Sequence, residues 1–254
     1  MRSVQGRATG RGEPWRIRDR RSGGLAALGL LLVLAACGRG ADRRPVSPPE
    51  ADRQASAPAP STATADSRPR IVILGDSLTA GHGLPSVDEA YPAVLQQKID
   101  RAGYDFEVIN AGVSGDTTAG GLSRLNWSLQ GDVRILVVAL GGNDGLRGVP
   151  AAEMERNLSA IIETAQSRGI AVLLAGMEAP PNYGPVYTAQ FREVFRHLAS
   201  RDHVAFLPFL LQGVAGVAAL NQPDGIHPTA AGAQIVAGNV WRVLQPMLAA
   251  AKTR

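Results

Sequence analysis

The sequence is poor in cysteine, histidine and aromatic residues. Its 254 residues include one cysteine and four histidines, and 5% of them are aromatic. A single cysteine excludes an internal disulfide. The histidines and carboxylates show no spacing typical of a metal site, so we expect neither a metal nor another cofactor. Few aromatic side chains disfavour a stacking platform for carbohydrate, although Trp127 and Tyr183 leave that alternative open.

The chain also lacks an excess of positive charge once its first 36 residues are set aside. The formal net charge is +4, but those 36 residues carry seven arginines against Glu13 and Asp19, a net charge of +5. The rest of the chain therefore carries −1. Because the positive excess lies in a segment that we expect to be removed, the composition disfavours a nucleic-acid partner.

An apolar stretch near the N-terminus is too short to cross a bilayer as a helix. Leu25–Ala36 follows an arginine-rich segment and has the length of a signal-peptide core. Leu34–Cys37 resembles the bacterial lipobox, in which the cysteine becomes the lipidated N-terminus. We therefore predict a signal peptide over residues 1–36, lipidation of Cys37, and an exported, membrane-anchored lipoprotein facing the periplasm or cell exterior. The alternative is an uncleaved apolar anchor with an incidental cysteine.

Residues 37–69 contain almost no large apolar side chains and are rich in Pro, Ala, Ser, Thr and Asp. Such a segment cannot bury enough surface to offset the entropy lost on ordering. We predict that it forms a disordered tether and that residues 70–250 form the folded domain.

Short apolar runs alternate with amphipathic segments through the rest of the chain. The apolar runs predict five strands, at residues 71–74, 106–110, 135–140, 170–174 and 204–207. The amphipathic segments predict helices over residues 91–102, 117–129, 151–168, 187–200 and 230–248, the last kinked at Pro246. Runs without a polar break are typical of strands buried on both faces. The pattern therefore predicts an α/β fold, a doubly wound five-stranded parallel sheet with helices on both faces.

Polar residues follow four of these apolar runs. In open α/β sheets, ligands bind outside the carboxyl ends of the strands. These ends are followed by Asp76-Ser77, by a glycine-containing loop over residues 110–117, by Asn143-Asp144, and by the segment over residues 224–228. The topology therefore gathers a serine, an asparagine amide, an aspartate and a histidine at one edge of the sheet.

These residue types suit acyl transfer. A serine hydroxyl needs a base, so Ser77 is the candidate nucleophile and His227 the candidate general base. Asp224 lies three residues before His227 and can orient its ring. The N–H groups of Ser77 and Gly115 and the side-chain amide of Asn143 are candidate oxyanion donors.

Structural alternatives exist for each of these side chains. Asp76 and Ser77 are both preferred helix caps, His227 can serve as a capping or core residue, and Asn143 can satisfy loop backbone. We expect a helix just after Ser77. We also expect Asp76 and Asp144 to orient turns. The remaining histidines are interpreted as surface or packing residues: His82, His197 and His203.

The four blocks together resemble those of the SGNH (GDSL) hydrolases. The longer matches at residues 114–117, 141–148 and 181–184 are similar to the bacterial thioesterase I, lysophospholipase L1 and arylesterase group. The resemblance covers roughly residues 70–248. It implies a flavodoxin-like three-layer fold, metal-free hydrolysis of acyl esters or thioesters, and the site roles given above. We expect a monomer. The lipobox and tether depart from the group.

The substrate is expected from position and by analogy with that group. Residues 145–149 are placed to move over an acyl chain, and residues 177–183 to form the opposite wall of a groove. The candidate groove residues are Leu146, Val149, Pro181 and Tyr183. Two alternatives remain, namely a carbohydrate or peptidoglycan O-acetylesterase on the same triad, and a catalytically silent, lipid-anchored binding protein.

Overall fold

Five parallel strands form a single sheet in the order β2-β1-β3-β4-β5. The computed structural model describes residues 68–251. The strands are β1 (Arg70–Gly75), β2 (Glu107–Gly112), β3 (Val133–Ala139), β4 (Ala171–Ala175) and β5 (Ala205–Leu207). β1 pairs with β2 and β3 and ends level with both, since Gly75 pairs with Gly112 and Ala139. This order is that of flavodoxin-like sheets, whose ligands lie outside the carboxyl ends of the strands.

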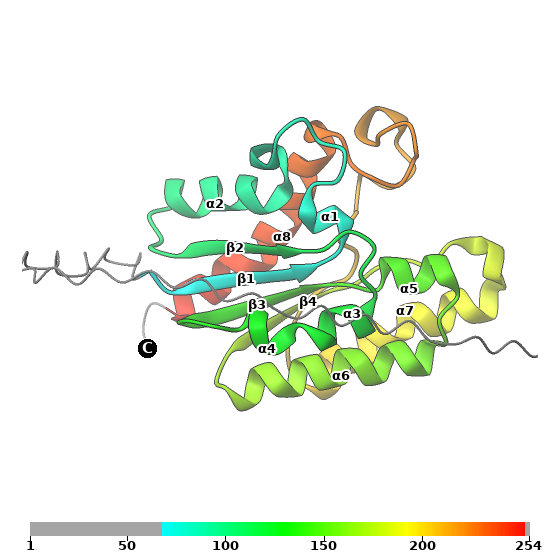
Figure 1. Cartoon of the computed structure of the whole chain (residues 1–254), viewed down its shortest axis with the longest axis horizontal. Coiled ribbons are helices and arrows are strands. Elements are labelled where there is room, and N and C mark those ends of the chain that lie inside the picture. The colour runs from blue at the N-terminus through cyan, green and yellow to red at the C-terminus, as the bar shows by residue number, and fades with distance from the viewer. Residues whose placement is uncertain (1–67, 252–254) are drawn as a thin grey trace, which may run out of the picture. The chain divides into compact units, whose positions relative to one another are not determined.

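Helices cover both faces of the sheet. In Figure 1, α2 and α8 lie on one face, and α3, α4, α6 and α7 lie on the other. Residues 71–74 of β1 are buried by these layers, which explains why that run has no polar break. The predicted three-layer α/β fold is therefore confirmed. The helices are α1 (Ser77–Ala80), α2 (Tyr91–Arg101), α3 (Thr118–Ser123), α4 (Leu125–Ser128), α5 (Gly142–Arg147), α6 (Ala151–Ser167), α7 (Gly184–Arg201) and α8 (Ala230–Ala251), with 3-10 turns η1 (Val87–Glu89), η2 (Pro181–Tyr183) and η3 (Ala218–Leu220).

The prediction of one continuous helix over residues 117–129 is wrong, because the helix is interrupted at Arg124, between α3 and α4. The Arg124 guanidinium donates to Asp116 Oδ2 at 2.6 Å, to the Ala111 carbonyl at 2.8 Å and to the Gly75 carbonyl at 2.9 Å. One side chain thus ties the ends of β1 and β2 to the loop after β2. Apolar periodicity carries no signal for this polar tie.

Other element boundaries differ by a few residues, and one helix was not predicted. The glycine-rich stretch after β3 forms α5, which ends at Gly148 in a left-handed conformation (φ 63°). α7 begins at Gly184, three residues earlier than predicted, where Pro185 fits the first turn. α8 continues through Pro246, and the predicted kink stays a prediction.

The predicted signal peptide, Cys37 and nearly all of the tether lie outside the described residues. Between residues 68 and 251, no helix combines the length and apolarity that a membrane crossing requires.

Candidate active site

Ser77 stands at the end of β1, where the chain turns sharply. A Cβ atom on Gly75 would lie 1.9 Å from Thr79 Oγ1, so this close approach requires glycine. Asp76 caps the one-turn helix α1, its Oδ1 accepting a hydrogen bond from the Leu78 N–H at 3.0 Å. Asp76 is therefore the residue that caps the helix, and Ser77 is the first residue of α1.

Ser77, His227 and Asp224 form one hydrogen-bonded chain. The distance from His227 Nε2 to Ser77 Oγ is 2.9 Å, and the distance from His227 Nδ1 to Asp224 Oδ2 is 2.7 Å. Ser77 and His227 are 150 residues apart in the sequence. The parallel sheet brings them to one edge, as the sequence predicted. A neutral His227 with its proton on Nδ1 can accept the proton of the Ser77 hydroxyl.

Asp224 is oriented by a tight turn. Its Oδ1 accepts hydrogen bonds from the Ile226 and His227 N–H groups, both at 3.0 Å, while Gly225 takes a left-handed conformation (φ 76°). Hydrogen bonds from the His227 ring and from these two N–H groups hold the pKa of Asp224 well below its ordinary value. Asp224 thus stays ionised, and the 42% exposure of its side chain to solvent also favours the charged form.

Asp76 has the opposite environment, because its side chain is buried. Burial raises the pKa of Asp76 from 3.8 to about 6, although the hydrogen bond from Leu78 and the nearby His227 oppose the shift. Its Oδ2 accepts from Asn143 Nδ2 at 3.3 Å, and Asn143 Nδ2 also donates to the Asp116 carbonyl at 2.9 Å. Asp76 therefore helps to fix which end of the Asn143 amide faces the site.

The candidate oxyanion donors come from three separate segments: α1, the loop after β2 and α5. Within residues 68–251, no acceptor is bonded to the N–H groups of Ser77 and Gly115. Gly115 has φ 86°, and its carbonyl accepts a hydrogen bond from Arg147 at 2.9 Å. Free N–H groups beside a serine that is hydrogen-bonded to a histidine are suited to bind a developing oxyanion.

Asp144 orients the backbone, as the sequence predicted. It is buried, and its two oxygens accept from the Thr118 N–H at 2.9 Å and the Thr118 hydroxyl at 2.6 Å. Asn157 on α6 donates to the same hydroxyl at 3.1 Å. These bonds join α5 to α3 and α6 and thereby fix the helix that carries Asn143.

An apolar groove of about 370 Å³ lies beside His227 and Asn143. Of the candidate groove residues, Leu146 and Pro181 line it, whereas Val149 and Tyr183 do not. Tyr183 instead donates from its hydroxyl to the Leu146 carbonyl at 2.9 Å, on the outer side of α5. Met177, Ala179 and Pro180 also line the groove and lie within the wall predicted over residues 177–183. The other apolar lining residues were not predicted: Leu78, Phe209, Leu211, Ala215 and Ile226.

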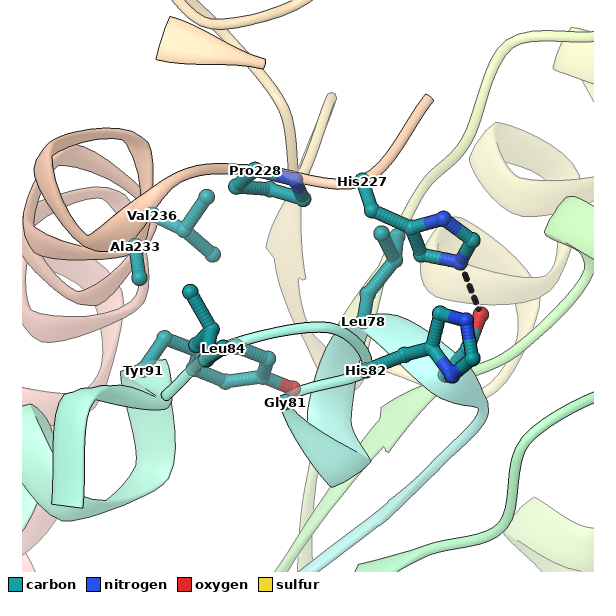
Figure 2. A pocket seen from close by; sticks show the side chains of 10 residues that line it. Leu78, Gly81, His82, Leu84, Tyr91, His227, Pro228, Ala233 and Val236 are labelled. Atoms are coloured by element: carbon teal, nitrogen blue, oxygen red, sulfur yellow. Dashed lines mark hydrogen bonds between the residues drawn. The ribbon is translucent and has the colours of Figure 1, made fainter. Parts of the chain in front are cut away.

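His82 lies next to His227, although its sequence context indicated only a surface or packing residue. Its ring centroid lies 4.7 Å from that of His227, and Figure 2 shows the two rings side by side next to the bond to Ser77. The available signal was its position between two glycines, five residues after Ser77. In the described part of the chain, the site included, no group of three or more His, Cys, Asp or Glu side chains is arranged to hold a metal ion.

The flavodoxin-like sheet and the serine, histidine and aspartate at its edge define an α/β protein with the geometry of a serine hydrolase. Residues 73–235 match the GDSL-like Lipase/Acylhydrolase family model. The chain belongs to this family, which confirms the predicted resemblance.

Solved and curated relatives support the same assignment. The chain is 44% identical over 179 residues to the esterase TesA of Pseudomonas aeruginosa, covering 70% of this chain and 89% of that protein. It is 37% identical over 179 residues to thioesterase 1/protease 1/lysophospholipase L1 of Escherichia coli K12, covering 70% of this chain and 84% of that protein. A crystal structure of TesA has a TM-score of 0.68 and 42% identity, covering 70% of this chain and 99% of that one.

Proposed function

We propose that the protein is a carboxylic ester hydrolase that cleaves acyl esters or thioesters through a Ser77-His227-Asp224 triad. The observation that carries the proposal is the continuous hydrogen-bonded chain from Asp224 to Ser77, at the rim of an apolar groove of about 370 Å³. The family includes relatives named esterase, arylesterase and thioesterase. The chemistry follows from the geometry in two half-reactions.

In the first half-reaction, Ser77 Oγ attacks the carbonyl carbon of the substrate while His227 Nε2 takes the hydroxyl proton. The carbonyl oxygen becomes an oxyanion, which the N–H groups of Ser77 and Gly115 stabilise. The Asn143 amide joins them by exchanging its 3.3 Å hydrogen bond to Asp76 for one to the oxyanion. The intermediate then expels the alcohol or thiol, which leaves with the proton from His227. An acyl-enzyme on Ser77 remains.

In the second half-reaction, water replaces the leaving group. His227 takes a proton from the water as it attacks the acyl carbon, and the same donors hold the second oxyanion. Collapse of this intermediate returns the proton to Ser77 Oγ and releases the carboxylic acid. Asp224 keeps its charge throughout and stabilises the transient positive charge on His227.

The groove supports a preference for an extended acyl chain. Its lining is mostly apolar and includes Leu146, Pro181, Leu211 and Ile226. Burying each methylene of a chain stabilises binding by about 0.8 kcal/mol. A pocket for an acetyl group alone would leave most of this apolar surface unused, which disfavours the O-acetylesterase alternative.

The test is hydrolysis of p-nitrophenyl esters from acetyl to dodecanoyl by the full chain and by its Ser77→Ala variant, with fluorophosphonate labelling of both. We expect Ser77-dependent turnover that peaks at medium or long chains. A peak at acetate would support the O-acetylesterase instead. A folded wild-type protein that neither turns over esters nor reacts with the fluorophosphonate would support the silent binding protein.

We further propose that the protein is exported and is anchored to a membrane through a lipid on Cys37. We also propose that it is a monomer. The lipobox-like Leu34–Cys37 segment and the composition of residues 38–69 support this proposal. The Cys37→Ser variant should leave the membrane fraction of cells that express the wild type there. Retention of the variant in the membrane would favour the uncleaved anchor, and light scattering of the detergent-solubilised protein would report its mass.

A further inference from the structure

His82 is held against the site by its own backbone. Its N–H donates to the Ser77 carbonyl at 3.0 Å, and its carbonyl accepts from Gln222 Nε2 at 2.7 Å. It lies between Gly81 and Gly83, which have φ 78° and 73°. A Cβ atom on Gly83 would lie 2.1 Å from Gln222 Oε1. The His82 loop therefore joins the nucleophile to the turn that carries His227.

The His82 ring limits the motion of the His227 ring. The two rings are tilted by 48° with centroids 4.7 Å apart, a spacing typical of aromatic packing. His227 is hydrogen-bonded at both nitrogens, but one partner, Asp224, is 42% exposed. Rotation of the His227 ring about χ2 would carry Nε2 away from Ser77. A ring packed against it opposes that rotation.

The crevice beside this ring pair is nearly filled, and Figure 2 shows the residues that line it. Its cavity volume is only about 10 Å³, and Leu84, Tyr91, Ala233 and Val236 are among its lining residues. Tyr91 is buried and shares a 2.8 Å hydrogen bond with Thr79 on α1. The ring pair therefore rests on a packed support and not on a ligand cavity.

We propose that His82 is a positioning residue, which holds His227 in hydrogen-bonding register with Ser77. The proposal rests on the proposed esterase function and adds to it a contact outside the triad. Positioning depends on the flat ring and not on its titration. An aromatic ring of similar shape is therefore expected to replace the imidazole.

The experiment compares His82→Ala and His82→Phe in the full chain, using p-nitrophenyl butyrate. We expect His82→Ala to lower kcat by about tenfold to a hundredfold with little change in KM, since small misplacements of reacting groups cost rates of this order. His82→Phe should keep kcat within about threefold of the wild type, less than about 0.7 kcal/mol, because the phenyl ring can pack against His227 in place of the imidazole. Both variants should keep the wild-type Tm.

A matched control is His197→Ala, which removes an exposed histidine on α7 whose only ion pair in the described residues is with Glu155 at 3.6 Å. It should leave kcat unchanged. Three results would overturn the proposal: a His82→Ala variant with wild-type kcat, equal losses in the Ala and Phe variants, or a kcat loss matched by a fall in Tm. Absence of turnover in the wild type would instead contradict the esterase function itself.

Discussion

Two aspartates beside the same serine show how differently one residue type is used. Asp76 is buried at the end of β1, and burial raises its pKa to about 6. Asp224 is half exposed on a turn, and hydrogen bonds from His227 and Ile226 lower its pKa. The nucleophile side of the site is thus fixed by burial, whereas the acid-base side is fixed by a turn in contact with solvent. Burial positions a carboxylate at the expense of its charge, whereas donors secure the charge without burial.

The largest effect is expected where the exposed carboxylate meets the histidine. In Asp224→Asn, the side-chain oxygen can still accept from Ile226 and His227, so the turn persists. The new amide N–H would face His227 Nδ1 and favour the tautomer whose Nε2 carries the proton, which cannot accept from Ser77. We expect kcat to fall about 10⁴-fold with an unchanged Tm. A fall of less than tenfold would mean that Asp224 does not set the tautomer.

On the buried side, the loss of one oxyanion donor should cost somewhat less. Asn143→Ala removes an amide that donates to the Asp116 carbonyl and to Asp76. We expect kcat to fall about 100- to 1,000-fold while KM changes little. Steady-state kinetics with p-nitrophenyl butyrate would measure both constants. A rise in KM at constant kcat would show that Asn143 binds the ground state instead.

The two pKa directions give opposite dependences of stability on pH. The pKa of Asp76 is raised, so its contribution to stability is present below its ordinary pKa of 3.8 and is lost as the pH rises through about 6. The loss amounts to about 3 kcal/mol. The lowered pKa of Asp224 gives a contribution that is present above pH 3.8 and is lost as the pH falls.

The Asp76→Asn variant isolates the first of these effects. Its free energy of unfolding, measured relative to that of the wild type, should increase by about 2 to 3 kcal/mol between pH 4 and pH 7.5, because the wild type loses stability over this range whereas the amide has no charge to bury. Urea unfolding at the two pH values measures the change. An equal difference between variant and wild type at both pH values would contradict a buried, costly carboxylate.

The contacts of the site also differ in how well the sequence predicted them. Ser77, Asn143 and His227 follow apolar runs that the periodicity identified, and a parallel sheet must bring the carboxyl ends of such runs to one edge. Asp224 lies within one turn of His227, so its contact followed from local spacing. The placements of Ser77 and Asn143 needed only the strand order and short loops, whereas His227 follows β5 after the longer connection over residues 208–226.

Contacts that depend on side-chain direction were not predictable in the same way. His82 meets His227 because α1 ends after one turn at Gly81, which no apolar pattern records. Arg124 lies where a helix is interrupted, and its guanidinium donates to the carbonyls of Gly75 and Ala111. Tyr183 lies in the predicted wall segment, but its ring packs on Tyr187 with a centroid distance of 5.3 Å and does not line the groove.

The smallest expected effect separates Leu146 and Val149, which both lie in the segment over residues 145–149 that the sequence predicted to contact the acyl chain. Leu146 lines the groove and is 46% exposed, whereas Val149 lies outside it, with its carbonyl accepting from the Tyr187 hydroxyl at 2.8 Å. Leu146→Gln should lower kcat/KM for dodecanoyl relative to butyryl ester by about fivefold, since it removes about one buried apolar contact of 1 kcal/mol. Val149→Gln is the matched change outside the lining. It should leave that ratio within about twofold of the wild type, which corresponds to less than about 0.5 kcal/mol. Equal shifts in both variants would mean that the acyl chain runs along the outer side of α5, and the groove between α5 and the 209–226 segment would then lose its role in chain-length selection.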